Sequence, residues 1–209
     1  VKLTEPKPGV FVFDMGQNFA GYTELTVRGP AGKQVKLRHG ERLFPDGSLD
    51  TRDIEQHIKR MGKEQQFQTS TYTLKGGGTE KWHSRFTYYG FQYVEVTGFP
   101  GKPTLDSLRG VFIHSDVPVA GEFECSNPLL NKIWRAGRWS YLSNLESIPT
   151  DCPHREKNGW TGDAHLAAEQ GIYNFLPAAV YTKWINDLGD EQKPGGQLPG
   201  IVPSSGWGY

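Results

Sequence analysis

The pattern of apolar and polar positions changes near residue 125 of the chain. Before that point, short apolar or alternating runs are separated by turn-forming residues, and 22–27 and 34–38 alternate with a period of two. This period is typical of half-buried strands. After residue 125, apolar residues recur at every third or fourth position, as they do along one face of a helix. The chain is therefore predicted to be an α+β multidomain protein, in which a β-domain precedes a helical region.

The first part has enough short strands for an antiparallel β-sandwich, which we expect over residues 1–118. The predicted strands cover residues 10–13, 22–27, 34–38, 69–74, 84–89, 93–97 and 108–114. Glycine and proline at 29–32 predict a hairpin turn between the second and third of these strands. Residues 50–66 are polar and charged, so we expect them to cross the surface with at most a short irregular helix.

The second part is predicted to contain three helices. Ser126 can cap the first helix, Pro128 suits its first turn, and its apolar spacing continues for about 18 to 20 residues. Thr161 or Asp163 is expected to cap the second helix, and Pro177 to open the third. The first two helices are joined by a loop that carries an unusual density of polar side chains.

This loop, residues 151–163, reads DCPHREKNGWTGD. It combines acidic, basic and aromatic side chains: Asp151, Arg155, Glu156, Trp160 and Asp163. Carboxylates spaced in this way can take separate roles, and an indole can desolvate a nearby carboxyl and raise its pKa toward the range of a general acid. Alternatively, the loop is an ordinary polar connection in which Asp163 caps a helix and Arg155 pairs with Asp151. Spacing alone leaves both interpretations open.

Composition narrows the possible partners, and no metal or cofactor is predicted. Lysine and arginine number 23, as do aspartate and glutamate, so nothing suggests nucleic acid or an anionic membrane as a partner. No apolar run approaches the roughly 20 residues of a membrane span. Cys125 and Cys152 are interpreted as buried thiols, because no further Cys or His lies at metal-ligand spacing. Tryptophan and tyrosine suit sugar binding, although core packing accounts for most of them.

The loop sequence resembles the signature of bacterial α-L-rhamnosidases, glycoside hydrolase family seventy-eight. Residues 123–131, which read FECSNPLLN, resemble the beginning of the helical catalytic domain in that family. Three earlier stretches resemble its β-domain, at residues 13–22, 38–41 and 85–94. The matches follow the order of the family over nearly the whole chain.

This resemblance implies an inverting glycosidase with a six-hairpin (α/α) toroid, of which residues 119–209 would supply the first helices. Glu156 matches the general acid of the family, which protonates the leaving oxygen while a second carboxylate activates water. The other matches are to sugar-binding positions: Asp151, Arg155, Trp160, Asp163 and, at another edge of the active site, Trp207. The implied partner is a rhamnose-containing glycoside or polysaccharide, and no cofactor is implied.

The resemblance also implies that this chain is only part of such an enzyme. About 85 residues follow Cys125, which leaves room for roughly three helices, so the barrel cannot close. The general base of the family lies farther downstream, and the chain alone should therefore be inactive. Apolar side chains meant for absent neighbours should be unusually exposed, or covered by another chain, as in a homo-oligomer. We expect this of Trp134, Tyr181, Trp184 and Leu188.

Other interpretations remain open from the sequence. The sandwich and the aromatic content also suit a non-catalytic carbohydrate-binding or scaffold module, and the helices suit another (α/α)-barrel glycosidase. The loop motif favours the enzyme, because a binding module has no need of it. Localisation stays open between bacterial cytoplasm, periplasm and secretion. No signal peptide is visible, but the chain begins at Val1 without methionine, so its start could have been processed or cut.

Several polar groups outside the loop have ordinary interpretations. His39 and Glu41 are expected to make cross-strand polar contacts rather than to bind a ligand. Asn18 is expected to shape a turn. The glycines at 76–78 are not a phosphate loop, because no Lys-Ser/Thr pair follows them. A small basic cluster is interpreted as solvated surface: Lys59, Arg60 and Lys63.

Overall fold

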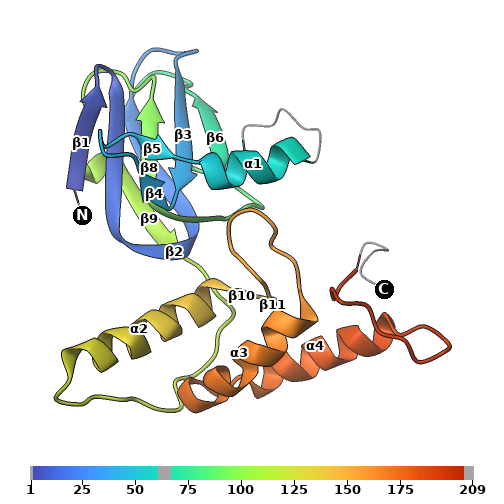
Figure 1. Cartoon of the computed structure of the whole chain (residues 1–209). Coiled ribbons are helices and arrows are strands. Elements are labelled where there is room, and N and C mark those ends of the chain that lie inside the picture. Colours follow the sequence, from blue (N-terminus) through green and yellow to red (C-terminus); the bar gives the residue numbers. More distant parts are fainter. Residues whose placement is uncertain (1, 61–66, 205–209) are drawn as a thin grey trace. The chain divides into compact units, whose positions relative to one another are not determined.

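Figure 1 shows the computed structural model, which describes residues 2–60 and 67–204. The chain divides into two compact units, Val1–Phe112 and Ile113–Tyr209, and each is described by itself. Two predictions concern positions or side chains outside the described part of the chain: Trp207, and the basic cluster of Lys59, Arg60 and Lys63.

The first unit is built around an antiparallel sheet. Its strands are β1 (Lys2–Lys7), β2 (Val10–Arg28), β3 (Gln34–Gly40), β4 (Arg42–Leu43), β5 (Leu49–Asp50), β6 (Thr69–Thr73), β7 (Thr79–His83), β8 (Tyr89–Thr97) and β9 (Leu108–Phe112). Helix α1 (Arg52–Arg60) and the short 3₁₀ helix η1 (Leu105–Ser107) lie between strands. The main sheet has the order β1-β2-β8-β3-β6, and β7 and β9 also pair with β2. The predicted antiparallel β fold is confirmed.

Strand β2 is 19 residues long and changes partners along its length. Its first part pairs with β1 on one side and β8 on the other. Its second part pairs with β9 over residues 21–25 and with β7 over residues 24–28. The register with β8 shifts between Asp14 and Phe19, where Gly16 adopts φ +79°. Such a bulge bends a strand and increases its twist, which lets β2 exchange one pair of neighbouring strands for another.

Contacts between side chains join strands of the first unit that are not neighbours in the sheet. Trp82 of β7 stacks on Tyr72 of β6 with ring centroids 5.0 Å apart, although these strands are not hydrogen-bonded to each other. Thr23 of β2 bonds to the His39 ring of β3. Each fully buried aliphatic or aromatic side chain adds about 1.5–3 kcal/mol of hydrophobic stabilisation. The largest of them in this unit are Val12, Phe13, Leu25, Val27, Val35, Leu37, Phe91, Val94 and Val96.

Three expectations for this unit need correction. The turn at 29–32 does not close a hairpin, because β8 lies between β2 and β3 in the sheet. Turn-forming residues show that the chain reverses direction, but not which strands then pair. Residues 84–88 form no strand, since the backbone turns at Phe86 (φ +58°) and β8 begins only at Tyr89. The polar stretch after residue 50 contains the regular helix α1, anchored by Ile54, which is 2% exposed.

His39 is a buried core residue and not a group at an exposed strand end. It has no exposed surface, and its ring stacks on Tyr89 with centroids 4.2 Å apart. Nε2 lies 3.0 Å from the Thr23 hydroxyl and Nδ1 lies 3.0 Å from the carbonyl of Gln68. The expectation of a polar contact within the fold is confirmed for His39. Asn18 donates a side-chain hydrogen bond to Glu41 at 3.0 Å.

The second unit contains the three predicted helices. They are α2 (Pro128–Ser143), α3 (Thr161–Asn174) and α4 (Ala178–Asp190), with the short strands β10 (Leu145–Glu146) and β11 (Ile148–Pro149) after α2. In the described residues, no helix is both long and apolar enough to cross a membrane.

The helix starts differ in detail from the predicted ones. Asn127, rather than Ser126, caps α2, because its side-chain oxygen accepts from the Leu129 amide at 2.9 Å. The helix has 16 residues, fewer than predicted. Neither Thr161 nor Asp163 caps α3. Both lie inside its first turn, and Trp160 occupies the N-cap position but makes no side-chain hydrogen bond to the helix amides.

Two small cores hold the helices of the second unit together. In one, Tyr141 stacks on Phe175 with ring centroids 5.4 Å apart. In the other, Trp184 packs with Ala164 and Val202. The prediction that Trp184 is exposed is wrong: it is 8% exposed, because residues near Val202 fold back over it and the indole N–H donates to the Val202 carbonyl at 3.3 Å. The three other side chains of this prediction are half-buried and not fully buried: Trp134, Tyr181 and Leu188.

Candidate active site

The loop between β11 and α3 is closed on itself by one backbone hydrogen bond and one bond from a backbone amide to a side chain. The Asp151 amide donates to the Asn158 carbonyl at 3.0 Å, and the Asn158 amide donates to Asp151 Oδ1 at 2.9 Å. Inside this ring, the Glu156 amide donates to the Cys152 sulfur at 3.4 Å, and Lys157 adopts φ +58°. The loop is therefore a defined polar turn whose central residues are Arg155 and Glu156.

The end of the loop is attached to the segment that follows α4. The Val202 amide donates to the Gly159 carbonyl at 2.8 Å, and the Thr161 amide donates to the Gly200 carbonyl at 2.9 Å. A Cβ at position 159 would lie 2.0 Å from the Val202 oxygen, so only glycine allows this approach. These bonds fix Trp160 at the start of α3.

Three predicted site residues form one linked group. The indole N–H of Trp160 donates to Glu156 Oε2 at 3.1 Å. The Arg155 Nε lies 4.0 Å from Glu156 Oε1, which is an ion pair but longer than a hydrogen bond. That Nε is buried and has no hydrogen-bond partner among the described residues. A buried donor without a partner is uncommon and often marks a functional site.

The two aspartates of the motif line a separate hollow. Asp151 and Asp163 both face a cavity of about 320 Å³, bounded by Tyr141 and Gln170 on α2 and α3. This volume is in the range of small-ligand sites, about 300–1,000 Å³. The alternative in which Arg155 pairs with Asp151 is not seen, because the ion pair of Arg155 is to Glu156. Asp163 is exposed at the rim.

A glutamate outside the motif was missed by the sequence analysis. Both carboxylate oxygens of Glu146, on β10, are buried and accept no hydrogen bond within the described chain. Burial raises the pKa of Glu146 to about 8, partly offset by attraction to Lys157. Burial likewise lowers the pKa of Lys157 to about 8. No sequence pattern marks Glu146, because only the fold brings β10 close to Lys157.

The remaining predicted groups are distributed as follows. Cys125 and Cys152 are free thiols, as predicted, but both are half-buried rather than buried. Burial raises the pKa of the Cys152 thiol. The candidate site within the second unit therefore consists of the linked group at Glu156, the hollow at Asp151 and Asp163, and the buried Glu146.

Both units match known protein families. Residues 4–114 match the bacterial α-L-rhamnosidase concanavalin-like domain, and residues 118–209 match the bacterial α-L-rhamnosidase six-hairpin glycosidase domain. The chain belongs to the bacterial α-L-rhamnosidase family. This membership confirms the predicted order of a β-domain followed by the start of a six-hairpin domain.

Individual family members are similar over nearly the whole chain. An α-L-rhamnosidase of Streptomyces avermitilis is 45% identical over 206 residues, which are 98% of this chain and 19% of that protein. A structure of that enzyme in complex with L-rhamnose superposes with a TM-score of 0.91. A structure of α-L-rhamnosidase from Dictyoglumus thermophilum has 42% identity and a TM-score of 0.93, and the match covers 100% of this chain and 23% of that one. The chain thus spans about a fifth of its rhamnosidase relatives.

Proposed function

We propose that this segment supplies the general acid and part of the sugar pocket of an inverting α-L-rhamnosidase, which releases terminal α-L-rhamnose from glycosides. The observation that carries the proposal is the arrangement of the motif at residues 151–163. It supplies both a carboxyl held by an indole and a guanidinium and two aspartates that line a nearby hollow. Membership of the family and the rhamnose complex of the S. avermitilis enzyme support the substrate.

Glu156 is the proposed general acid. Its Oε2 accepts the Trp160 indole N–H, which leaves Oε1 to carry the transferable proton. Arg155, 4.0 Å from Oε1, would orient the carboxyl and place positive charge beside the carboxylate that forms after proton transfer. Asp151 and Asp163 would accept hydrogen bonds from rhamnose hydroxyls in their shared hollow. The second carboxylate that activates water is proposed to lie downstream in longer family members, so this segment alone should not turn over substrate.

The experiment is a comparison of leaving groups in a full-length enzyme that carries this segment, either the parent protein or a chimera with the S. avermitilis relative. Glu156→Gln preserves shape and removes the proton. We expect a rate loss of about 10²–10⁴-fold on a natural rhamnoside. The loss should be smaller on p-nitrophenyl rhamnoside, because a nitrophenolate leaves without protonation. Glu169→Gln is the matched control, since Glu169 is exposed on α3 and, among the described residues, its carboxylate accepts a hydrogen bond from Tyr173 alone.

Two further results would discriminate among roles. Asp151→Asn should weaken binding and turnover to the same extent for both substrates. Proton NMR of the first sugar released should show β-L-rhamnose, the product of inversion. An equal loss for Glu156→Gln on both substrates would assign the acid role to another carboxyl, and release of the α-anomer would contradict the inverting mechanism.

A further inference from the structure

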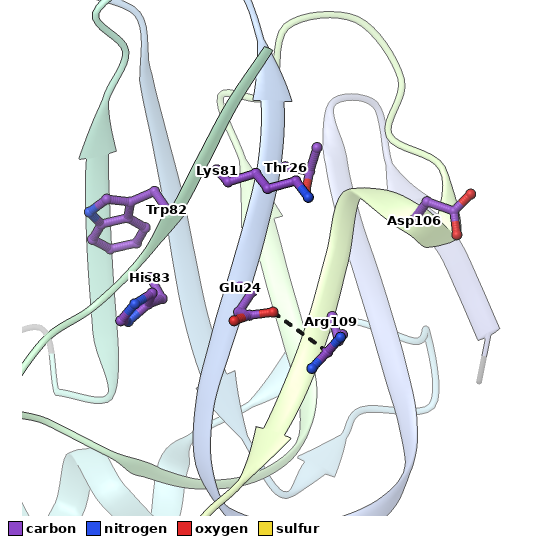
Figure 2. Close-up of a pocket in the computed structure, with 7 residues that line it drawn as sticks. All are labelled: Glu24, Thr26, Lys81, Trp82, His83, Asp106 and Arg109. Carbon is purple, nitrogen blue, oxygen red and sulfur yellow. Dashed lines mark ion pairs between the residues drawn. The ribbon is translucent and has the colours of Figure 1, made fainter.

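A polar groove lies on the first unit, separate from the motif residues of the second unit. Its volume is about 390 Å³, and Figure 2 shows the side chains that line it. They come from three adjacent strands and from η1, and all belong to the same compact unit. The lining residues are Glu24 and Thr26 of β2, Lys81, Trp82 and His83 of β7, Asp106 of η1, and Arg109 of β9. We call this surface the outer groove.

Backbone register determines which side chains meet in the outer groove. Glu24 is paired with His83 of β7 on one side and with Arg109 of β9 on the other. Thr26 is paired with Lys81. Residues directly opposite on paired strands project from the same face, and residues two apart on one strand do so as well. These five side chains therefore form two adjacent rows on one face of the β7-β2-β9 sheet.

The opposite face of the same strands forms part of the core, which keeps the rows in place. Thr23, Leu25 and Val27 of β2 are buried at 2% exposure or less. They alternate with Glu24 and Thr26. Because turning the strand over would expose these buried residues, Glu24 and Thr26 stay on the groove face.

The groove has balanced charge and a high capacity for hydrogen bonding. Glu24 and Asp106 are acidic, and Lys81 and Arg109 are basic. Arg109 Nε lies 3.5 Å from Glu24 Oε2, a pair marked in Figure 2. Among the described residues, neither Lys81 nor Asp106 makes an ion pair or side-chain hydrogen bond, so their capacity is available to a ligand.

One aromatic ring stands at the β7 side of the groove. His83 packs beside Tyr22 with ring centroids 5.0 Å apart. Trp82 is paired with the buried Leu25 and stacks on Tyr72, so its ring belongs to the opposite, core face and anchors β7 there. A ring held by a second ring is pre-oriented and loses little conformational freedom when a ligand binds. The groove therefore offers the His83 ring next to donors and acceptors of both kinds.

We propose that the outer groove is a carbohydrate-binding site for one or two neutral pyranose units. Balanced charge disfavours a phosphate or polyanion, whereas neighbouring hydroxyls of a pyranose can both donate to a carboxylate and accept from a guanidinium or ammonium group. The apolar CH face of the sugar would lie toward the aromatic side. The volume is within the range of small-ligand sites. The site does not depend on the hydrolytic reaction proposed above and would retain glycan near the enzyme.

The test is a titration of the ¹⁵N-labelled chain with methyl α-L-rhamnoside, cellobiose and galacturonate, followed by ¹H–¹⁵N NMR. We expect at least one neutral sugar to shift the amides of Glu24, Thr26, Lys81 and His83, with a Kd of about 0.1–10 mM, as suits a shallow site. Glu24→Gln and Arg109→Ala should each weaken this binding at least about tenfold.

A matched control variant checks that the amide shifts report on the groove, and some results would contradict the proposal. Arg135→Ala removes an exposed arginine on α2 in the other unit and should leave the groove shifts unchanged. Shifts with galacturonate alone would overturn the neutral-sugar assignment. Three results would overturn the site itself. They are shifts confined to residues 151–163, shifts that persist in both groove variants, and no shift at a sugar concentration 50-fold above the expected Kd. Retained spectra of the variants would show that they are folded.

Discussion

Gly159 in the motif loop offers a sharp test of how the candidate site is held together. Its substitution by alanine adds a Cβ that would lie 2.0 Å from the Val202 oxygen and 2.9 Å from the Val202 carbonyl carbon. Real Cβ atoms essentially never approach closer than 3.0 Å, so one of the two segments must move by about 1 Å. Both neighbouring atoms belong to backbone, so no side-chain rotation relieves the clash.

The cost can be worked out from the contacts that this movement breaks. Two backbone bonds join the segments, Val202 to Gly159 and Thr161 to Gly200, and each is worth about 1 kcal/mol. Val202 has no exposed surface, and a side chain of this kind contributes about 1.5–3 kcal/mol when fully buried. Alanine also lowers the entropy of the unfolded chain, which offsets about 0.4–1 kcal/mol of this loss in stability. We expect a net loss of about 3–4 kcal/mol in the free energy of unfolding of the second unit.

The assay is urea unfolding of the whole chain, followed by tryptophan fluorescence. Gly162→Ala is the matched control, because it lies three residues away in α3 and a Cβ there would meet nothing within 4 Å. Higher helix propensity should make Gly162→Ala more stable by about 0.5–1 kcal/mol. The reasoning is refuted if the two variants unfold at the same urea concentration. The close approach at Gly159 would then contribute nothing to the free energy of unfolding.

The remaining predictions concern the buried groups of the second unit. A ¹³C NMR titration should place the midpoint of Glu146 near pH 8, against an ordinary value of 4.5, and a midpoint below 6 would contradict its burial. Because the pKa is raised in the folded state, the contribution of Glu146 to stability is greatest below pH 4.5 and falls as pH rises to about 8, and Glu146→Gln should remove this slope. Trp184→Ala should cost about 3–5 kcal/mol in thermal or urea unfolding, whereas Leu166→Ala, at a side chain 82% exposed, should change stability by less than about 0.5 kcal/mol. Tyr141→Phe removes the 3.0 Å hydrogen bond to Tyr181 and should cost about 1 kcal/mol by the same measurement.

Periodicity predicted the type of most elements but not their pairing. The alternation at 22–27 identifies a strand, yet it cannot show that β8 separates this strand from β3, since pairing depends on residues distant in the sequence. The apolar spacing of α4 correctly placed Trp184 on an apolar face. It could not show that the segment at Val202 would return to cover that face.

The candidate site was predictable only where its residues are neighbours in the sequence. The motif is local, so Glu156 and Trp160 could be singled out, and the structure joins them by a hydrogen bond. Glu146 is separated from the motif by a turn, and its burial depends on packing rather than on spacing. The outer groove is assembled from β2, β7, η1 and β9, so no continuous stretch of sequence contains it.

The exchange of partners along β2 has a consequence for how the first unit opens. This strand bonds to β1 and β8 through one half and to β9 and β7 through the other, so neither set of strands can separate without disrupting β2 itself. Local opening that releases only one set should therefore be rare, and the amides of β2 and β8 should exchange with solvent deuterium through global unfolding. In an enzyme that carries this segment, the β-domain would then act as a single cooperative block rather than as two sets of strands that loosen separately.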